Sequence, residues 1–158
     1  MLFNGEKSEV ILFSKFIKSC KSNFFICNKQ IKVSDSYKHL GININANKMI
    51  DMTDAIRDIK IKSNVIANEF KKQKYETLVK LFNAHCMSLY GCNLWDYTSS
   101  DFIRIQVQWR KCIRYVLKLP FRTHNILIPH LIQTEPIETI IHNRFLNFFI
   151  RGVNHDNN

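Results

Sequence analysis

The sequence predicts an α+β fold in which a small antiparallel β unit is followed by a mainly α-helical bundle. Two patterns support this: hydrophobic residues alternate in short runs over residues 1–45, whereas after Asp51 they recur with the helical period. A third observation is that the 158 residues include only 4 Gly and 3 Pro, too few for a turn-dense all-β chain. Because 46% of the residues are hydrophobic, the chain can bury a core, which excludes a disordered basic tail.

The expected β unit, residues 1–45, contains four strand-like segments. A two-residue turn at Asn28 and Lys29 is expected between the second and third, although Gly would be favoured at the second turn position. In the last segment, Leu40 and Ile42 alternate with polar residues as one half-buried strand would, and residues 45–48 are expected to form a linker. The four segments are Val10–Phe13, Phe24–Cys27, Gln30–Val33 and Tyr37–Ile44.

The helical part, residues 46–158, contains five segments with a helical hydrophobic period. The second is expected to run to Tyr90, and the third from a cap at Ser99 or Ser100 to about Lys118. Pro136 stands where the first turn of the last helix is expected, and Phe148 and Phe149 are assigned to that helix's core face. The five segments are expected to begin near Asp51, Glu76, Ser99, Asn125 and Glu135.

The formal charge of +10 is unevenly distributed. Residues 1–50 and 102–158 each carry a net charge of +5, whereas residues 51–101 are neutral. The 33 residues from Phe102 to Thr134 contain no Asp or Glu. An acid-free basic stretch is typical of nucleic-acid-binding surfaces, although AT-rich coding can also enrich a chain in Lys.

The third predicted helix lies in this acid-free stretch and has two different faces. Arg104, Lys111 and Lys118 form a row with heptad spacing, flanked by Arg110 and Arg114. Such a row can follow a nucleic-acid backbone and contact phosphates without reading bases. The alternative is an ordinary amphipathic helix with a solvated cationic face. The opposite face is expected in the core and comprises Phe102, Ile105, Trp109, Cys112, Ile113 and Val116.

The sequence contains no recognisable catalytic or metal-binding motif. His85–Cys86 with Cys92, and His124 with His130, lack the spacings of common metal sites, so neither metal nor cofactor is expected. Asp54 and Asp58 lie among basic residues as on a solvated helix face. The five cysteines form no CxxC pair, which favours a reducing intracellular compartment, the nucleus or cytoplasm. No stretch is apolar enough to span a membrane. The cysteines are Cys20, Cys27, Cys86, Cys92 and Cys112.

A series of short segments occurs in a characteristic order along nearly the whole chain. They are Phe3–Ser8, Val10–Phe13, Ile31–Val33, Tyr37–Ile42, Leu89–Asp96, Trp109–Arg114, Leu119–His124, Pro136–Ile137 and Arg144–Phe145. Together they resemble the C-terminal part of the reverse transcriptases of non-LTR retrotransposons, the LINE and jockey-like elements. No single segment is specific, so the resemblance depends on their order and spacing.

The resemblance implies that residues 1–45 are a palm edge with the primer grip and that the helices are a thumb. Lys7 would then lie near the triphosphate of the incoming nucleotide, with Tyr37, Leu40 and Gly41 against the 3′ end of the primer. The implied partners are RNA, an RNA/DNA template-primer and the remainder of the palm. From the residues alone, Lys7 is equally well a solvated turn lysine, and Gly41 a strand bulge.

Two departures from the family limit what the resemblance implies. His39 stands where the family usually has another aromatic residue. The family polymerises with Mg²⁺ held by aspartates, and its Tyr/Phe-x-Asp-Asp hairpin and earlier metal-binding Asp would both precede Met1. We therefore expect a fragment that binds template-primer without polymerising. Two alternatives remain: an independent basic helical module that binds nucleic acid or a partner, and an unrelated structural domain whose lysines reflect coding bias.

Overall fold

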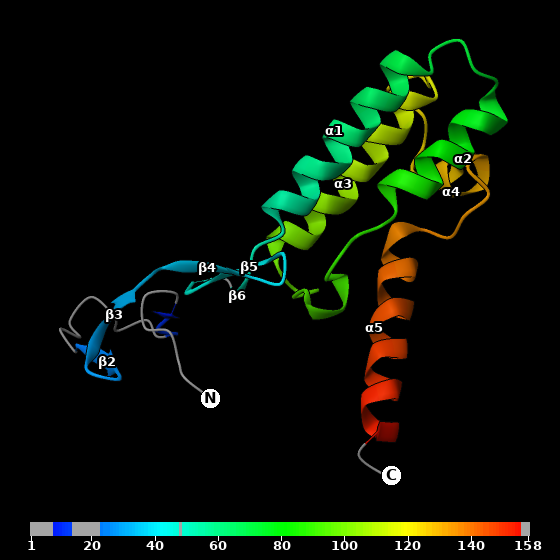
Figure 1. The fold of residues 1–158 in the computed structure, drawn as a ribbon. Helices are drawn as coiled ribbons and strands as arrows, with labels where there is room; N and C mark the ends of the chain where they lie inside the picture. The colour runs from blue at the N-terminus through cyan, green and yellow to red at the C-terminus, as the bar shows by residue number, and fades with distance from the viewer. Residues whose placement is uncertain (1–7, 14–22, 48, 156–158) are drawn as a thin grey trace. The chain divides into compact units, whose positions relative to one another are not determined.

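The computed structural model describes residues 8–13, 23–47 and 49–155, so Lys7 lies outside the described residues. The fold is α+β, with small sheets followed by helices, as the sequence predicts (Figure 1). The chain divides into two compact units, Met1–Asp51 and Met52–Asn158. No helix within the described ranges is both long and apolar enough to cross a membrane.

The described residues of the first unit form two three-stranded sheets. In one sheet β3 lies between β1 and β2, pairing parallel with β1 and antiparallel with β2. In the other sheet β5 pairs antiparallel with both β4 and β6. The strands are β1 (Glu9–Val10), β2 (Phe24–Ile26), β3 (Lys29–Val33), β4 (Ser36–His39), β5 (Ile42–Asn45) and β6 (Met49–Ile50).

The two hairpin turns differ from the sequence-based expectation. The β2–β3 turn is formed by Cys27 and Asn28, with φ of 49° and 62°, one residue earlier than predicted. Leu40 and Gly41, with φ of 47° and 83°, form a second turn that divides the predicted Tyr37–Ile44 strand into β4 and β5. Two-residue hairpin turns with positive φ at both positions match the twist of the flanking strands, and Gly41 accommodates this conformation without strain.

The expected linker at residues 45–48 does not hold for the residues that the structure describes, and Lys48 lies outside them. Asn45 belongs to β5 and pairs with Met49 of β6, so Ala46 and Asn47 lie in a turn between two paired strands. The side chain of Asn45 accepts a 2.9 Å hydrogen bond from the Asn47 backbone N–H. Asn favours turns through this local hydrogen bond, which explains why a polar segment without a hydrophobic pattern reverses the chain here.

The second unit is a bundle in which α1 and α3 pack side by side and run in the same direction (Figure 1). Trp109 of α3 is 1% exposed; its indole Nε1 donates to Met87 Sδ at 3.0 Å and its ring meets Phe82 edge-on. All six residues predicted for the core face of this helix are buried. The helices are α1 (Thr53–Glu69), α2 (Tyr75–Cys86), the 3₁₀ turn η3 (Cys92–Leu94), α3 (Ser100–Val116), α4 (Leu127–Leu131) and α5 (Ile137–His155).

Two helical predictions need correction. The second helix ends at Cys86 rather than Tyr90, because Leu89 and Gly91 adopt positive φ and lead the chain into η3. On α5, Phe148 and Phe149 are more than half exposed, so they do not belong to the core as predicted. The helical spacing of Phe148 and Phe149 continues that of the buried Ile137 and Ile141, which is why the sequence assigned them to the core face. In the structure, however, no element of the described chain covers the two phenylalanines.

Candidate nucleic-acid interface

The five basic residues predicted on α3 differ in whether their charged groups form ion pairs or hydrogen bonds within the protein. Arg104 is exposed and forms an ion pair of 2.8 Å with Asp101, which is buried in the first turn of α3. The turn is capped by Ser99, whose hydroxyl accepts from the Phe102 N–H, as the sequence predicts. Arg104 therefore carries a charge that is already partly compensated at the start of the helix.

Arg110 and Arg114 are held by intramolecular contacts. Arg110 forms an ion pair with Glu138 of α5, and both side chains are mostly buried. Arg114 donates from Nη2 to the Thr123 carbonyl oxygen at 2.8 Å and to Asn125 Oδ1 at 2.6 Å. The sequence could not reveal these contacts, because the partners lie 9 to 28 residues away. Arg110 thus links α3 to α5, and Arg114 fixes the loop before α4.

Lys111 and Lys118 are exposed, and neither takes part in an ion pair within the described residues. Lys111 lies within α3, but Lys118 follows the Leu117 cap with a φ of 52°, so it does not continue the helical row. The backbone N–H of Lys118 donates to the Tyr115 carbonyl oxygen. The predicted row of three is therefore a pair of accessible lysines plus the compensated Arg104.

A cationic hollow lies where α1 and α3 end side by side. Its volume is about 420 Å³, and Lys71, Arg114, Tyr115 and Lys118 contribute its polar side chains. Ala67 and Leu119 complete the lining, which contains no acidic residue. Sequence reasoning missed Lys71, because only the parallel packing of α1 and α3 brings it near the end of the third helix.

The cations of this hollow differ in mobility. The hydrogen bonds to residues 123 and 125 fix the Arg114 guanidinium, whose buried Nε has no hydrogen-bond partner within the described chain. Lys71 and Lys118 are exposed and can move. The hollow therefore combines one oriented guanidinium with two mobile ammonium groups, which suits an anion such as phosphate. The lysines also offset the negative ends of the two helix dipoles, which is a structural role.

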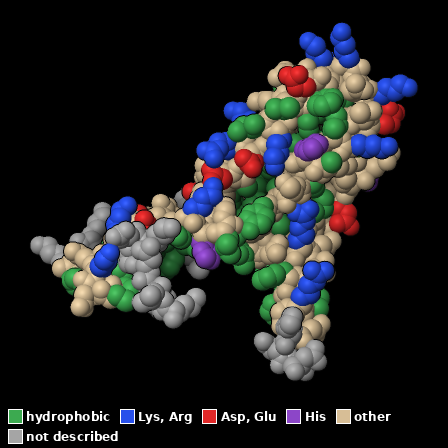
Figure 2. Space-filling view, in the orientation of Figure 1, with side chains coloured by type: hydrophobic (Ala, Val, Ile, Leu, Met, Phe, Trp, Pro, Cys, Tyr) green, Lys and Arg blue, Asp and Glu red, His purple; other side chains and the backbone are tan. Residues whose placement is uncertain are grey.

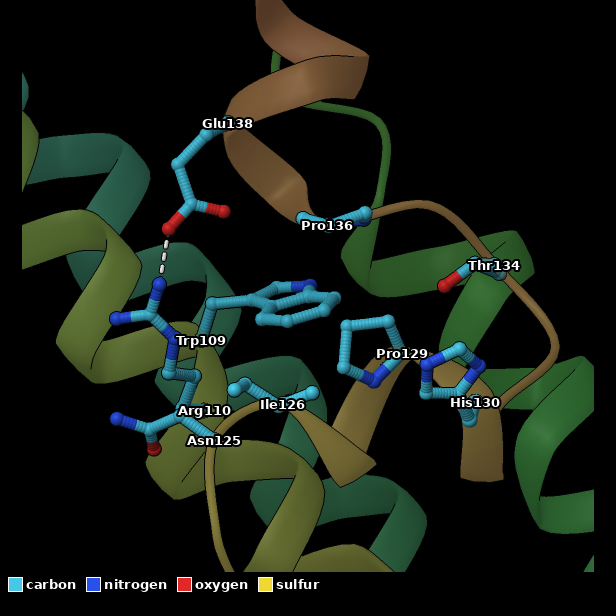
Figure 3. Close-up of a pocket in the computed structure, with 9 residues that line it drawn as sticks. All are labelled: Trp109, Arg110, Asn125, Ile126, Pro129, His130, Thr134, Pro136 and Glu138. Carbon is cyan, nitrogen blue, oxygen red and sulfur yellow. Dashed lines mark hydrogen bonds and ion pairs between the residues drawn. The ribbon is translucent and has the colours of Figure 1, made fainter.

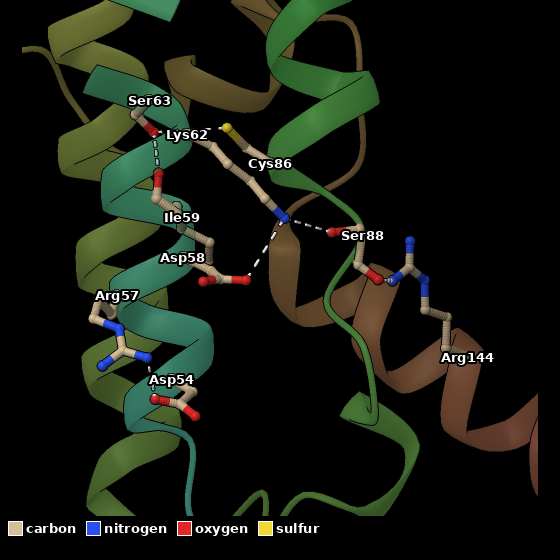
Figure 4. Close-up of polar contacts among 9 residues, drawn as sticks. All are labelled: Asp54, Arg57, Asp58, Ile59, Lys62, Ser63, Cys86, Ser88 and Arg144. Carbon is tan, nitrogen blue, oxygen red and sulfur yellow. Dashed lines mark hydrogen bonds and ion pairs between the residues drawn. The ribbon is translucent and has the colours of Figure 1, made fainter. Parts of the chain in front are cut away.

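Most cations on α1 are compensated, as Figure 4 shows. Arg57 pairs with Asp54 at 2.7 Å, and Lys62 lies 3.8 Å from Asp58 and 3.3 Å from the Ser88 hydroxyl. On the face drawn in Figure 2, acidic side chains are interspersed among the basic ones. The net charge of +10 thus does not form a uniform basic surface on this face, and the hollow stands out by its lack of acids.

The residues assigned by resemblance to the primer grip lie at the β4–β5 hairpin. Tyr37 on β4 is 39% exposed, and Leu40 at the turn is 76% exposed. Gly41 completes the turn and is also exposed. The hairpin thus ends in a large apolar side chain beside a residue without Cβ.

Neither Cys86 nor Tyr97 has a lowered pKa, and the described residues contain no cluster of metal-binding side chains. Burial raises the pKa of the Cys86 thiol to about 11, although the Ser63 hydroxyl beside it opposes that shift (Figure 4). Burial likewise raises the pKa of the Tyr97 phenol to about 12. Both groups stay protonated at neutral pH. Among the residues that the structure describes, no three His, Cys, Asp or Glu side chains gather as a metal site would require.

Comparison with known proteins gives no relative: no protein-family model, curated protein or solved structure matches this chain. Of the features described above, the cationic hollow is the candidate site for nucleic acid, because its lining combines three cations with no acidic residue.

Proposed function

We propose that this chain is a palm-edge and thumb-like fragment of a non-LTR retrotransposon reverse transcriptase that binds template-primer RNA/DNA through phosphates. The observation that carries the binding proposal is the acid-free hollow with Lys71, Arg114 and Lys118. The polymerase ancestry is supported by the ordered sequence segments described above.

Backbone contact is the mode of binding that these side chains favour. Lys111 and Arg114 both lie on α3, three residues or about 4.5 Å apart along the helix axis, whereas Lys118 follows the end of that helix and lines the hollow. A nucleic-acid strand has a phosphate about every 3.4 Å of its axis, so cations with this spacing can contact neighbouring phosphates. Arg114 provides the oriented donor between the two lysines in sequence. Contacts of this kind set affinity and position without specifying a base sequence.

The chain by itself is not expected to polymerise. Two-metal phosphoryl transfer needs carboxylates that hold two cations a few Å apart, and the sequence has no Asp-Asp pair to supply them. In the proposed function, the exposed Leu40 and the Gly41 backbone would support a primer end, since a residue without Cβ permits close approach to a sugar-phosphate. Purified protein with primed template, dNTPs and Mg²⁺ should give no incorporation above a control without protein.

The salt dependence of binding tests the hollow directly. In a Lys71→Gln/Lys118→Gln double variant, the slope of log K against log salt should become shallower by about 1.4 to 1.8, the value for two lost phosphate contacts. Fluorescence anisotropy with RNA/DNA hybrids of two sequences measures this slope, and both hybrids should lose affinity to a similar extent.

The matched control is Lys60→Gln/Lys80→Gln, which removes the same charge from exposed positions outside the hollow. Urea unfolding of both variants separates binding from the helix-dipole role, which is about 0.3 to 1 kcal/mol for each lysine. Equal slopes for the two double variants would contradict phosphate binding in the hollow and leave its lysines a structural role alone.

One observation favours the alternative of a partner-binding module. The C-terminal half of α5 exposes five large apolar side chains within three turns. Exposed apolar clusters of this kind commonly mark interaction surfaces. Loss of self-association or of partner binding upon substitution of this cluster, with unchanged hybrid binding, would favour that alternative. The residues are Leu146, Phe148, Phe149, Ile150 and Val153.

A further inference from the structure

A second pocket, of about 390 Å³, lies between α3, α4 and the start of α5 (Figure 3). Its volume is in the lower part of the range of roughly 300 to 1,000 Å³ found for ligand pockets. Rings and aliphatic groups supply much of its lining, with polar groups of five further residues around them. The apolar lining residues are Trp109, Ile126, Pro129 and Pro136, and the polar ones are Arg110, Asn125, His130, Thr134 and Glu138.

Two polar atoms of this pocket are buried without a hydrogen-bond partner in the described chain, namely Thr134 Oγ1 and Glu138 Oε2. Glu138 uses its other carboxylate oxygen for the ion pair with Arg110, which holds the carboxylate in place. In Figure 3 the Thr134 hydroxyl points toward the space in front of Trp109 and Pro129. Because unpaired buried polar atoms are costly, a ligand that donates N–H groups here would be favoured.

The pocket adjoins the cationic hollow along α3. Arg110 lines the pocket and Arg114, one helical turn later, lines the hollow. Arg114 also donates to Asn125 Oδ1 at 2.6 Å, and Asn125 belongs to the pocket. A strand whose phosphates lie in the hollow would therefore have the pocket within reach of a neighbouring base. This continuity favours a nucleobase over an apolar peptide side chain as the occupant.

We infer that this pocket takes a single unpaired nucleobase with an exocyclic amino group, from a strand whose phosphates lie in the hollow. The inference rests on the proposed function and adds a base site to it. The apolar residues would face the ring, while Glu138 accepts from the amino group as carboxylates do from cytosine N4. Uracil has a carbonyl oxygen at that position, and two acceptors facing each other repel.

Free nucleosides test this site separately from the hollow, because they carry no phosphate. Cytidine titrated into the full chain should shift the backbone amide NMR signals of residues 134–138, and uridine should bind several-fold more weakly. Thr134→Val removes the hydroxyl with little change of shape and should weaken cytidine binding roughly three- to tenfold, the equivalent of one hydrogen bond. Thr139→Val, at an exposed position of α5 outside the pocket, is the matched control and should bind as the wild type does.

A Glu138→Gln variant provides a second readout that does not depend on stability. An amide can donate to uracil O4, so the preference for cytidine over uridine should fall. No cytidine-dependent shift at residues 134–138, or equal binding of both nucleosides by the wild type, would overturn the base site. Such a result, with the salt slope of hybrid binding still reduced in the hollow variant, would leave the proposed function intact.

Discussion

Replacing Trp109 with Ala should strongly destabilise the helical unit. The indole is 1% exposed, meets the Phe82 ring at a centroid distance of 6.3 Å and donates to Met87 Sδ. Truncating a buried aromatic side chain to Ala costs about 3 to 5 kcal/mol, within which the aromatic pair accounts for roughly 0.5 to 1.5 kcal/mol. Domains of this kind are stable by only about 5 to 15 kcal/mol, so a large share of the stability would be lost.

Urea unfolding followed by far-ultraviolet circular dichroism measures this loss. With a denaturant slope of about 2 kcal/mol per M, a loss of about 4 kcal/mol moves the midpoint down by roughly 2 M. Ile103→Ala is the control, because Ile103 lies on the same helix but is 60% exposed, and it should change stability by no more than about 0.5 kcal/mol. A Trp109→Ala loss below 1 kcal/mol would refute the assignment of Trp109 to the core.

Four further predictions concern reactivity and local stability. Iodoacetamide should label the exposed Cys27 quickly, while Cys86, Cys92 and Cys112 react only on unfolding; peptide mapping that finds equal rates would contradict their burial. Folding raises the pKa of the Cys86 thiol from 9.0 to about 11. Between these two pH values the unfolded chain loses the thiol proton while the folded chain keeps it, so the contribution of Cys86 to the free energy of unfolding is complete below pH 9 and should disappear between pH 9 and 11. The difference in urea stability between wild type and Cys86→Ala isolates this effect, and a pH-independent difference would argue against it. Arg144→Ala removes donors to the Met87 and Ser88 carbonyl oxygens and should cost about 1.5 to 3 kcal/mol, with faster amide exchange in α5; unchanged exchange would show that other contacts hold this helix. Amides of β3 should exchange faster than those of α3, because small sheets have little core to protect them, and equal protection would contradict that view.

Local signals were sufficient to predict the fold class and most of α3. Its hydrophobic residues are spaced so that one face is apolar whatever the helix packs against, and Ser99 caps the first turn through its own hydroxyl. The hairpin turns were harder, because Cys27 and Leu40 occupy positions with positive φ that Gly or Asn usually takes. Tertiary pairing overrides such local preferences, so a strand pattern alone did not show where the chain reverses.

The candidate site depends on long-range contacts that no local pattern encodes. A helical projection places Arg104, Lys111 and Lys118 in one row, yet the helix ends before Lys118. Arg110 meets an acid 28 residues later in the chain. Lys71 joins the hollow only because α1 and α3 run in parallel. Charge along the sequence thus indicated the stretch that supplies Arg114 and Lys118 to the hollow, but it could not separate cations that bind within the protein from those open to a ligand.

Among the residues that the structure describes, the buried residues of α5 and the hydrogen-bonded Arg144 lie in the N-terminal half of that helix. Its first turns are fixed by the buried Ile137 and Ile141 and by Arg144, whereas every residue from Leu146 to Asn154 is exposed. Beyond Arg144 the helix extends for about 15 Å, fewer residues than an isolated helix needs to be stable in water. The anchored turns therefore serve as the nucleus for the projecting ones. A partner that binds residues 146–154 would find this segment already helical. Binding would then not have to supply the free energy of helix nucleation and would only have to suppress fraying at the C-terminal end of α5.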